Sequence, residues 1–312
     1  MAGDERLPLV VILGPTAVGK TGLALEVAGA LNGEIVGADS RQVYRYMDIG
    51  TAKPTLEERR QVAHHLVDVI NPDDQLSLQR YQTMALNAIR DIQKRDRLPL
   101  LVGGTGQYIT AIVDGWTIPE VPPNEALRAE LETFAKMSGA EALHARLQEI
   151  DPEAAQKIHP NNVRRVIRYL EMIYATGGSV ASLQRKQPPP YRIYQLGLEM
   201  ERQALYARSD QRIDQMMALG FLDEVQVLLD KGYSRTLPSM SGLGYAQLAS
   251  HLLDGTPLHD AVEATKAATR DFIKRQMTWF RGHDSGIVWH NVEQSSPNDL
   301  IDMLGAWLEE RA

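Results

Sequence analysis

The chain has 312 residues, a formal net charge of −7 and no cysteine, and 44% of its residues are hydrophobic. This length suffices for one large domain or two modest ones with a hydrophobic core. The lack of cysteine excludes disulfides, thiolate zinc sites and cysteine nucleophiles, and it fits a reducing compartment. The sequence shows neither a signal peptide nor an apolar run long enough to cross a membrane, so we expect a cytoplasmic protein.

Strand-like and helical segments alternate in the first third of the chain. Apolar runs predict strands at Leu9–Leu13, Glu34–Ala38, His65–Ile70 and Leu98–Val102, and helical patterns lie between them at about Thr21–Leu31 and Ser77–Arg95. This alternation is typical of an α/β fold, a parallel sheet covered by helices. Functional sites in such sheets form at the carboxyl ends of the strands.

After Trp116 the pattern becomes helical. Pro119, Pro122 and Pro123 interrupt the chain, and a proline run at residues 188–190 closes the block. Between these prolines, the spacing of apolar residues predicts helices at about Asn124–Met137, Ala140–Glu149 and Asn161–Ala175.

The last part of the chain returns to a mixed pattern. Tyr191–Leu198 predicts a strand that rejoins the sheet. Further helices and one short strand are predicted at about Arg202–Ala218, Leu222–Asp230, Tyr245–Leu253, Leu258–Phe280 and Ile287–Trp289, before a final helix. We therefore expect an α/β core made of residues 1–116 and 191–312, with an all-helical insertion domain at residues 117–190.

The clearest motif follows the first predicted strand. Gly14-Pro15-Thr16-Ala17-Val18-Gly19-Lys20-Thr21 fits the P-loop pattern G-x-x-x-x-G-K-[ST]. The glycines let backbone N–H groups point at an anion, Lys20 can neutralise phosphate oxygens and the Thr21 hydroxyl can hold Mg²⁺. The motif predicts a P-loop NTPase-like sheet that binds a di- or triphosphate, and leaves open which compound that is.

Two further polar loops follow predicted strands. Asp39 comes directly after the second strand, where a carboxylate can hold Mg²⁺ or accept a proton from a nucleophile. The alternative is that Asp39 is the N-cap of a helix. The segment Gly103–Tyr108 follows the fourth strand. We expect these loops and the P-loop to meet at one edge of the sheet.

Two basic clusters interrupt an otherwise acidic chain. The first contains Lys157, Arg164, Arg165, Arg168, Arg185, Lys186 and Arg192, and the second Lys266, Arg270, Lys274, Arg275 and Arg281. Local clusters of this kind indicate contact with a polyanion. The alternative is that they are solvated faces of helices.

Several blocks together resemble one family, the tRNA dimethylallyltransferases, also called tRNA isopentenyltransferases. The blocks are the P-loop, Asp39–Tyr44, Met47–Pro54, Leu101–Tyr108, His159–Arg165 and Lys274–Arg281, and they span nearly the whole chain. Many enzymes share the P-loop, whereas the run Asp48–Pro54 combined with Gly103–Thr105 is far more specific. Because no cysteine-based zinc finger is present, the chain resembles the bacterial form.

The resemblance implies a reaction. Members of the family transfer a dimethylallyl group from dimethylallyl diphosphate to the N6 amine of the adenosine 3′ of the anticodon, giving N6-isopentenyladenosine and diphosphate. By its match to the family, Asp39 is the general base, Thr16 lies near the donor and Arg212 contacts the diphosphate. Mg²⁺ is the implied cofactor, with Thr21 as its ligand.

The resemblance also implies tRNA as the partner, bound through its anticodon stem-loop by the core and the insertion domain. Residues that match the family's tRNA contacts are Asp39, Ser40, Arg41, Gln42, Thr105, Leu127, Val163, Arg164, Arg165, Val166 and Ile167. We expect Arg164 and Arg165 to pair with phosphates or stack on bases, and Gln42 to read a base edge. A monomer is the family default.

Other conspicuous side chains have simpler explanations. His64 and His65 are expected to be sheet-edge or core histidines. Trp279 and Phe280 could stack on RNA bases, but aromatic side chains late in an amphipathic helix usually face the core.

Two other functions remain open from the sequence. An ATP-dependent small-molecule kinase shares the P-loop and Asp39, but we find no arginine-rich lid motif, and a basic insertion is surplus for a small acceptor. A nucleotide-gated RNA-binding module would use the same features without catalysis. No motif specifies which tRNAs are accepted, whether ATP also binds the P-loop, or the oligomeric state.

Overall fold

The computed structural model describes residues 6–179, 186–187, 189–283 and 286–310. The chain divides into two compact units. One, the core unit, is made of Met1–Val113 and Pro189–Ala312, and the other, the helical unit, is Asp114–Pro188. The core unit is therefore built from two segments that flank the helical unit in the sequence.

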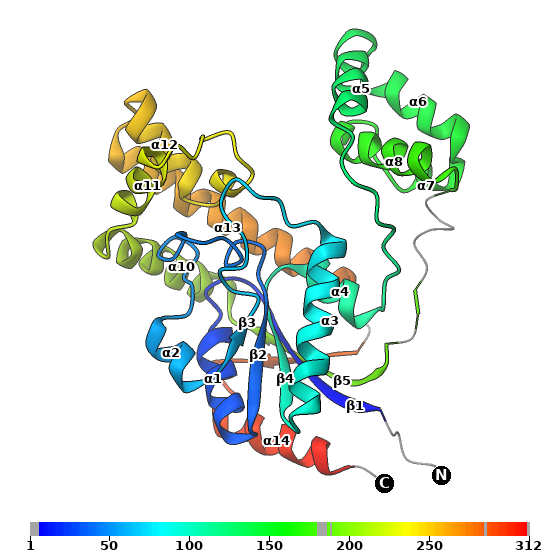
Figure 1. Cartoon of the computed structure of the whole chain (residues 1–312). Coiled ribbons are helices and arrows are strands. Elements are labelled where there is room, and N and C mark those ends of the chain that lie inside the picture. Colours follow the sequence, from blue (N-terminus) through cyan, green and yellow to red (C-terminus); the bar gives the residue numbers. More distant parts are fainter. Residues whose placement is uncertain (1–5, 180–185, 188, 284–285, 311–312) are drawn as a thin grey trace. The chain divides into compact units, whose positions relative to one another are not determined.

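A parallel β-sheet organises the core unit (Figure 1). Within the described residues it has six strands in the order β3-β2-β4-β1-β5-β6, and each neighbouring pair is parallel. The strands are β1 (Leu7–Leu13), β2 (Gly33–Ala38), β3 (His64–His65), β4 (Leu98–Gly103), β5 (Tyr191–Glu199) and β6 (Ile287–Asn291). This confirms the predicted parallel sheet. β1 lies between β4 and β5, so strands that follow β1 in the sequence lie on both sides of it. In parallel sheets a ligand crevice is expected at such a topological switch point.

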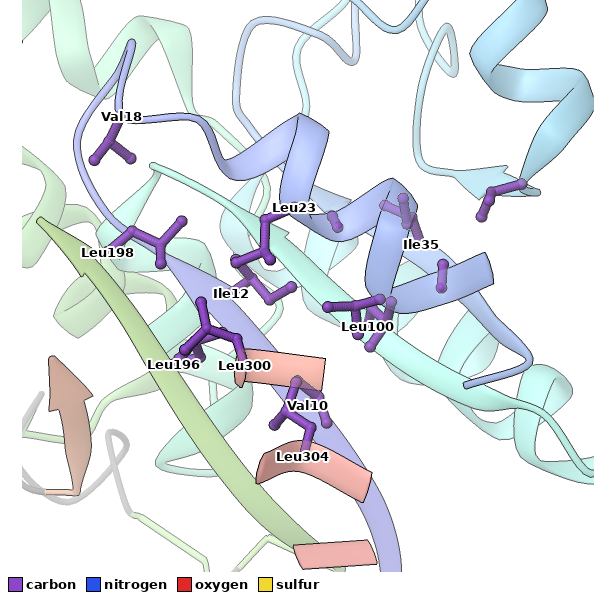
Figure 2. Packing of buried hydrophobic residues seen from close by; sticks show 14 of the residues in the cluster. Val10, Ile12, Val18, Leu23, Ile35, Leu100, Leu196, Leu198, Leu300 and Leu304 are labelled. Atoms are coloured by element: carbon purple, nitrogen blue, oxygen red, sulfur yellow. The ribbon is translucent and has the colours of Figure 1, made fainter. Parts of the chain in front are cut away.

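The strands are apolar because both faces of the sheet are covered. In β1, Val10 and Ile12 belong to one buried cluster and Leu9, Val11 and Leu13 to another, and all five are fully buried. A near-continuous apolar run is what a strand with two covered faces requires. Figure 2 shows the first cluster, in which the labelled side chains include Val10, Ile12, Leu23, Leu100, Leu196, Leu300 and Leu304.

Helices pack on both faces. α1 (Lys20–Ala30) and α14 (Pro297–Glu309) cover the face of Val10, while α3 (Leu78–Lys94) and α4 (Gly106–Val113) cover the other. In α3 the buried residues recur at helical spacing as Tyr81, Ala85, Ile89 and Ile92. None of the helices in the described part of the chain is both long and apolar enough to cross a membrane.

Most of the remaining helices of the core unit build a third apolar cluster with the loop after β2. These elements are α10 (Arg202–Ala218), α11 (Phe221–Asp230), the 3₁₀ turn η1 (Ser239–Ser241), α12 (Tyr245–Asp254) and α13 (Leu258–Gly282), whereas α2 (Leu56–Gln61) buries none of its residues. The rings of Phe221 and Tyr245 meet edge to face with centroids 4.9 Å apart. Val43 and Met47, which are 1% and 0% exposed, join this cluster and fix the loop.

The predicted strand His65–Ile70 is wrong in extent. Only His64 and His65 pair with β2, as a short strand at the edge of the sheet. Leu66 and Asp68 adopt positive φ angles of 64° and 57°. A residue in this left-handed region turns the chain away from an extended ladder. Ile70 then pairs only through an isolated bridge to Tyr44.

The described residues of the helical unit surround their own apolar core. They form α5 (Glu125–Ser138), α6 (Ala140–Ile150), α7 (Pro152–Gln156) and α8 (Val163–Thr176). The buried Glu171 carboxylate accepts hydrogen bonds from the Arg128 and Arg168 side chains and, at 2.7 Å, from the Asn124 N–H. Burial alone would raise the pKa of Glu171, but these bonds outweigh it and lower that pKa. The carboxylate thus links the start of α5 to α8.

The segments that open and close the helical unit are tied to each other. The Asp114 carboxylate lies 2.5 Å from the Lys186 ammonium, and the Gln187 N–H donates to the Gly115 carbonyl at 2.9 Å. Trp116 and Lys186 form an isolated antiparallel bridge. These contacts make Asp114–Pro188 the compact unit, a few residues away from the expected boundaries of 117 and 190.

A second buried carboxylate holds the edge of the core sheet. Glu34 of β2 is 1% exposed, and its oxygens lie 2.7 Å from His65 Nε2, 2.8 Å from Arg95 Nη2 and 3.2 Å from Arg97 Nη1. Burial alone would raise the pKa of Glu34, but the hydrogen bonds from Arg95 and His65 lower it below its ordinary value of 4.5. Such a group stabilises the fold above its unfolded pKa, and this stability is lost as pH falls through its folded pKa.

We predict that Glu34→Gln lowers the free energy of unfolding at neutral pH by about 1–3 kcal/mol, because it removes a buried charge from its hydrogen-bonded cations. The deficit relative to wild type should shrink as pH falls from 4.5 through the lower pKa of folded Glu34, where the folded wild type also loses this charge. Urea denaturation at several pH values measures this. The exposed Glu26 provides the control variant Glu26→Gln. A deficit that is independent of pH would show that shape rather than charge is responsible.

Candidate active site

A cavity of about 420 Å³ lies at the carboxyl ends of the central strands of the core unit. Its described walls come from the P-loop and α1, from β2 and the loop after it, from β4 and from α10. The lining residues include Thr16, Lys20, Thr21, Asp39, Gln42, Thr51, Gly103, Arg208 and Arg212. The volume falls within the range of about 300–1,000 Å³ that is typical of small-molecule sites.

The P-loop owes its shape to two glycines. Gly14 has a φ of 149°, and a Cβ at this position would lie 2.5 Å from the carbonyl oxygen of Leu198 in β5. Gly19 has a φ of 108° and precedes α1 without a side-chain cap. The N–H groups in the first turn of α1 therefore have no capping side chain, and Lys20 and Thr21 lie at the cavity wall. A helix start of this kind is an anion-binding site.

The Lys20 ammonium is turned toward its own loop. It donates hydrogen bonds to the carbonyl oxygens of Gly14 at 3.0 Å and Pro15 at 2.7 Å. Burial lowers the pKa of Lys20 to about 7, while the Asp39 carboxylate raises it and the Arg212 guanidinium lowers it further. Lys20 therefore gives up its proton more readily than an ordinary lysine does.

Asp39 lies at the cavity wall, where its position after β2 predicts it. Its Oδ1 accepts a hydrogen bond from the Arg41 N–H at 2.8 Å, so Asp39 caps a turn, and the alternative of a helix N-cap is wrong. The Ser40 N–H donates to Thr105 Oγ1 at 2.9 Å, and the Thr105 N–H donates to the Ala38 carbonyl at 3.1 Å. These bonds join the loops after β2 and β4, as the sequence predicts.

Two arginines one helical turn apart on α10 line the cavity, Arg208 and Arg212. Burial lowers the pKa of Arg212, while Asp39 raises it and Arg208 lowers it. Arg208 lies beside the P-loop, since a Cβ added at Gly19 would be 3.5 Å from its Nη2. The family resemblance pointed to Arg212 but not to Arg208. The only sequence signal for Arg208 is the spacing of four residues between two arginines on one helix face.

Arg41 and Gln42 use their donors within the core unit. Arg41 Nη1 donates to the Pro238 carbonyl at 2.7 Å. Gln42 Nε2 donates to the carbonyls of Thr51 at 3.2 Å and Ala52 at 3.1 Å. With its amide nitrogen engaged in this way, Gln42 has its Oε1 to offer to a base edge.

The distinctive block Met47–Pro54 forms a loop held by one carboxylate. Glu224 of α11 accepts hydrogen bonds from the N–H groups of Asp48 at 2.8 Å, Ile49 at 2.7 Å and Gly50 at 3.1 Å. Three convergent N–H donors make a strong site for a carboxylate. Glu224 lies 174 residues after Gly50, and no motif in the sequence connects the two.

Lys53 holds the same loop from within. Its side chain is 1% exposed, and its ammonium lies 2.5 Å from Asp48 and 2.7 Å from Asp68. The loop in turn places Thr51 and Pro54 at the cavity wall. Lys53 therefore supports the site structurally rather than binding a ligand.

The cavity offers a magnesium ion few protein ligands. The Thr21 hydroxyl and the Asp39 carboxylate both lie at its wall. Among the described residues, no group of three or more His, Asp or Glu side chains is placed to hold a metal. This donor set fits Mg²⁺, which in phosphate sites takes one or two protein oxygens and completes its shell with phosphate oxygens and water.

In the helical unit, the residues expected to contact tRNA are of two kinds. Arg164 and Arg165 are exposed in the first turn of α8. The others pack wholly or partly into the apolar core of the unit: Leu127, Val163, Val166 and Ile167. Since Val166 and Ile167 are only 0% and 5% exposed, their side chains serve packing, and only their backbone could reach a ligand.

Ion pairs within the chain account for many of the clustered basic residues. In the second cluster these pairs are Lys266–Asp214, Arg270–Asp210, Lys274–Asp271 and Arg281–Glu199. In the first cluster they are Lys157–Glu153, Arg168–Glu171 and Lys186–Asp114. Arg185 lies outside the described residues. The second cluster is thus largely paired, with the exposed Arg275 lying over the Phe272 ring, and the polyanion hypothesis rests mainly on Arg164 and Arg165.

Comparison with known proteins supports a single family. A family model described as IPP transferase matches residues 42–283. A tRNA dimethylallyltransferase of Roseiflexus castenholzii is 54% identical over 275 residues, which cover 88% of this chain and 90% of the relative. A tRNA dimethylallyltransferase of Thermomicrobium roseum is 47% identical over 291 residues, covering 93% of this chain and 88% of the relative.

Solved structures lead to the same family. The full-length tRNA isopentenylpyrophosphate transferase of Bacillus halodurans has a TM-score of 0.73 and 41% identity, with 98% of each chain covered. A eukaryotic dimethylallyltransferase, described in crystallographic snapshots as acting on tRNA, has a TM-score of 0.85 and 26% identity, with 98% of this chain and 80% of that chain covered. These matches confirm the resemblance seen in the sequence. With its parallel sheet, its P-loop and matches over most of its length, the chain belongs to the IPP transferase family, among the tRNA dimethylallyltransferases.

Proposed function

We propose that the core cavity binds dimethylallyl diphosphate and that the protein transfers the dimethylallyl group to the N6 amine of the adenosine 3′ of the anticodon in tRNA. The observation that carries the proposal is the meeting of the P-loop, Asp39 and Arg212 at one cavity. The family supplies the reaction class. The cavity supplies a group for each charge that this reaction moves, namely cations for the leaving diphosphate and a carboxylate for the proton.

The leaving group is the first requirement. The carbon–oxygen bond at the allylic carbon breaks, and its electron pair leaves with the diphosphate. Lys20, Arg212 and the N–H groups at the start of α1 are placed to bind the resulting charge, and Arg208 adds a further cation. Burial of Lys20 and Arg212 makes their attraction for an anion stronger than it would be in water. Mg²⁺, held by the Thr21 hydroxyl and diphosphate oxygens, would neutralise further charge when bound.

The nucleophile is the second requirement. The adenine N6 amine is weak because its lone pair is drawn into the ring, so it must be placed accurately and relieved of a proton. As the carbon–nitrogen bond forms, the N6 proton passes to the Asp39 carboxylate. Thr16 lies at the same cavity wall and is proposed to orient the donor and the base.

We assign the binding of the anticodon stem-loop to both units. In the core unit, Ser40 and Gln42 belong to the loop that carries Asp39, and Thr105 of the loop after β4 bonds to that loop. In the helical unit, Arg164 and Arg165 present two exposed cations on the first turn of α8. Such side chains pair with phosphates or stack on unpaired bases, which an anticodon loop offers.

We also infer that the protein acts as a monomer in the cytoplasm. For the oligomeric state, the support is the family resemblance, in which a monomer is the default. The chain contains no cysteine, which fits a reducing compartment.

The activity has a direct test, and Asp39→Asn is its sharpest variant. With dimethylallyl diphosphate, Mg²⁺ and tRNA, we expect the wild type to form N6-isopentenyladenosine, detected by mass spectrometry of the digested tRNA. Asn keeps the acceptor oxygen for the Arg41 N–H but cannot take a proton. The rate should therefore fall about 10²–10⁴-fold.

The same experiment separates the alternatives. A parallel incubation with radiolabelled ATP should transfer no label to tRNA or to a small acceptor. Phosphoryl transfer from ATP would favour a kinase, and tight RNA binding without a covalent change would favour a binding module. Either outcome would overturn the proposal.

Arg208 and Arg212 should both contribute to anion binding. Replacing either with Gln removes a charged donor from the cavity wall, so we expect affinity for inorganic diphosphate to fall about 10–100-fold, as for the loss of one hydrogen bond to a charged group. Isothermal titration calorimetry measures this. Arg202→Gln is the matched control, because Arg202 is an exposed arginine on the same helix that bonds to Tyr206. If the wild type and the three variants bound diphosphate equally well, neither Arg208 nor Arg212 would take part in anion binding.

The lowered pKa of Lys20 predicts a pH dependence. Above a pKa of about 7 the free protein holds Lys20 largely uncharged, and binding of diphosphate must return a proton to it. Affinity should therefore fall as pH rises from about 7 to 9, by up to about tenfold per unit. The affinity for diphosphate is measured at each pH for the wild type and for Lys20→Met. The ratio of the two affinities is free of the contribution of the ligand's own ionisation. A constant ratio between the two affinities would contradict this.

A further inference from the structure

The two residues proposed to work on the reacting groups, Thr16 and Asp39, come from different loops. Thr16 belongs to the P-loop after β1, and Asp39 follows β2, a strand that is separated from β1 in the sheet by β4. Neither loop bonds to the other directly through these two residues in the described structure. Something must therefore set the distance between the Thr16 hydroxyl and the Asp39 carboxylate.

Gln276 of α13 lies between these loops. It is 6% exposed, and both ends of its amide are used: Oε1 accepts from the Thr16 N–H at 2.9 Å, and Nε2 donates to the Gly104 carbonyl at 2.9 Å. The orientation of the amide is unambiguous, because a backbone N–H can only donate and a carbonyl can only accept. Gln276 thus bridges the P-loop and the loop after β4, 260 and 172 residues away in the sequence.

From Gly104 the connection continues to Asp39. The next residue, Thr105, accepts the Ser40 N–H on its hydroxyl at 2.9 Å and donates its own N–H to the Ala38 carbonyl at 3.1 Å. Ala38 and Ser40 flank Asp39 on both sides. A continuous series of hydrogen bonds therefore runs from the Thr16 backbone through the Gln276 amide to the backbone on either side of Asp39.

Glycines next to α13 leave just enough space for the side chains of Gln276 and Trp279. A Cβ at Gly104 would lie 2.4 Å from Gln276 Nε2, so any larger residue would displace the side chain. One turn later on α13, Trp279 covers Gly106, where a Cβ would lie 2.1 Å from its ring, and its Nε1 donates to Thr110 at 3.2 Å. α13 therefore contacts both the loop after β4 and the helix α4 that follows it, and the expectation that Trp279 faces the core is confirmed.

We propose that Gln276 is a positioning residue: its buried amide sets the placement of Thr16 relative to Asp39 and thereby the rate of prenyl transfer. This rests on the proposed function. Gln276 acts through Thr16 and Gly104 and does not bind the diphosphate, because Lys20, Thr21 and the start of α1 lie outside its contacts. A misplacement of about 1 Å in a reacting group can cost 10²-fold in rate.

The test compares catalysis with anion binding in Gln276→Met and Gln276→Glu. Met has a similar length but makes neither bond, and Glu keeps an acceptor for Thr16 but turns a second oxygen toward the Gly104 carbonyl. We expect kcat to fall about 10–100-fold in both, with the KM for the donor little changed. The Kd for inorganic diphosphate should stay within about threefold of wild type, since the anion-binding groups are untouched.

Two further variants keep the proposal open to refutation if the buried substitutions unfold the protein. Gly104→Ala leaves Gln276 in place but pushes on its amide, so it should lower kcat in the same direction, and it should cost little more when added to Gln276→Met. Gln226→Met, an exposed Gln→Met exchange on α11, should behave as wild type. Thermal melting of each variant checks folding.

The outcomes are distinct. Unchanged kcat in folded Gln276→Met and Gly104→Ala would overturn the positioning role while the wild type still prenylates tRNA. A diphosphate affinity that falls in step with kcat would also overturn it, because Gln276 would then support the anion cradle as a whole. Absence of prenyl transfer by the wild type would instead refute the proposed function.

Discussion

A buried ammonium group needs a negative charge nearby to compensate for the loss of water. In the cavity, the Lys20 ammonium has little such compensation. Among the described residues Lys20 forms no salt bridge, and it donates only to two carbonyl oxygens of its own loop. Burial therefore lowers its pKa to about 7 even though Asp39 acts in the opposite direction. Two arginines on α10 add further positive charge. This excess of positive charge suits the binding of an anion, and the diphosphate proposed to bind here would supply the missing negative charge.

This arrangement depends on the parallel sheet. Because parallel strands end at the same edge, the P-loop, the Asp39 loop and the loop at Gly103 meet although they lie far apart in the chain. The close approach of Gly14 to the carbonyl of Leu198 also requires β5 beside β1. The segment that forms β5 follows the helical unit, so the core cavity is shaped by both parts of the divided core unit.

Polar contacts act together with apolar packing to hold the loops around the cavity. Glu224 gathers three N–H groups of the loop at residues 48–50, Lys53 binds two carboxylates beside it, and Gln276 bridges the P-loop and the loop after β4. Each is a directional contact, and Lys53 and Gln276 are buried, so that a wrong geometry there is costly. Such contacts fix distances between loops more closely than non-directional apolar contacts do. This suits a reaction in which a carbon atom and a weak nucleophile must be brought together accurately.

Local patterns in the sequence were sufficient for much of the fold. Apolar runs marked β1, β2, β4 and β5 to within a few residues, and helical spacing marked the long helices. The P-loop and the position of Asp39 after a strand identified the centre of the site, and the resemblance added the family. Local patterns failed where the backbone leaves the ordinary regions, as at Leu66 and Asp68, which cut the predicted third strand to two residues.

What the sequence by itself determined is therefore the kind of fold and the residues proposed to carry the reaction, because these depend on short-range periodicity and on a contiguous motif. Only the tertiary structure decided which side chains support those groups. Arg208, Glu224 and Gln276 act across separations that no local pattern records. It also showed that Val166 and Ile167 are packing residues and that much of the basic charge is paired within the chain. Burial and pairing are properties of the folded chain, since they depend on which distant segments the sheet brings together.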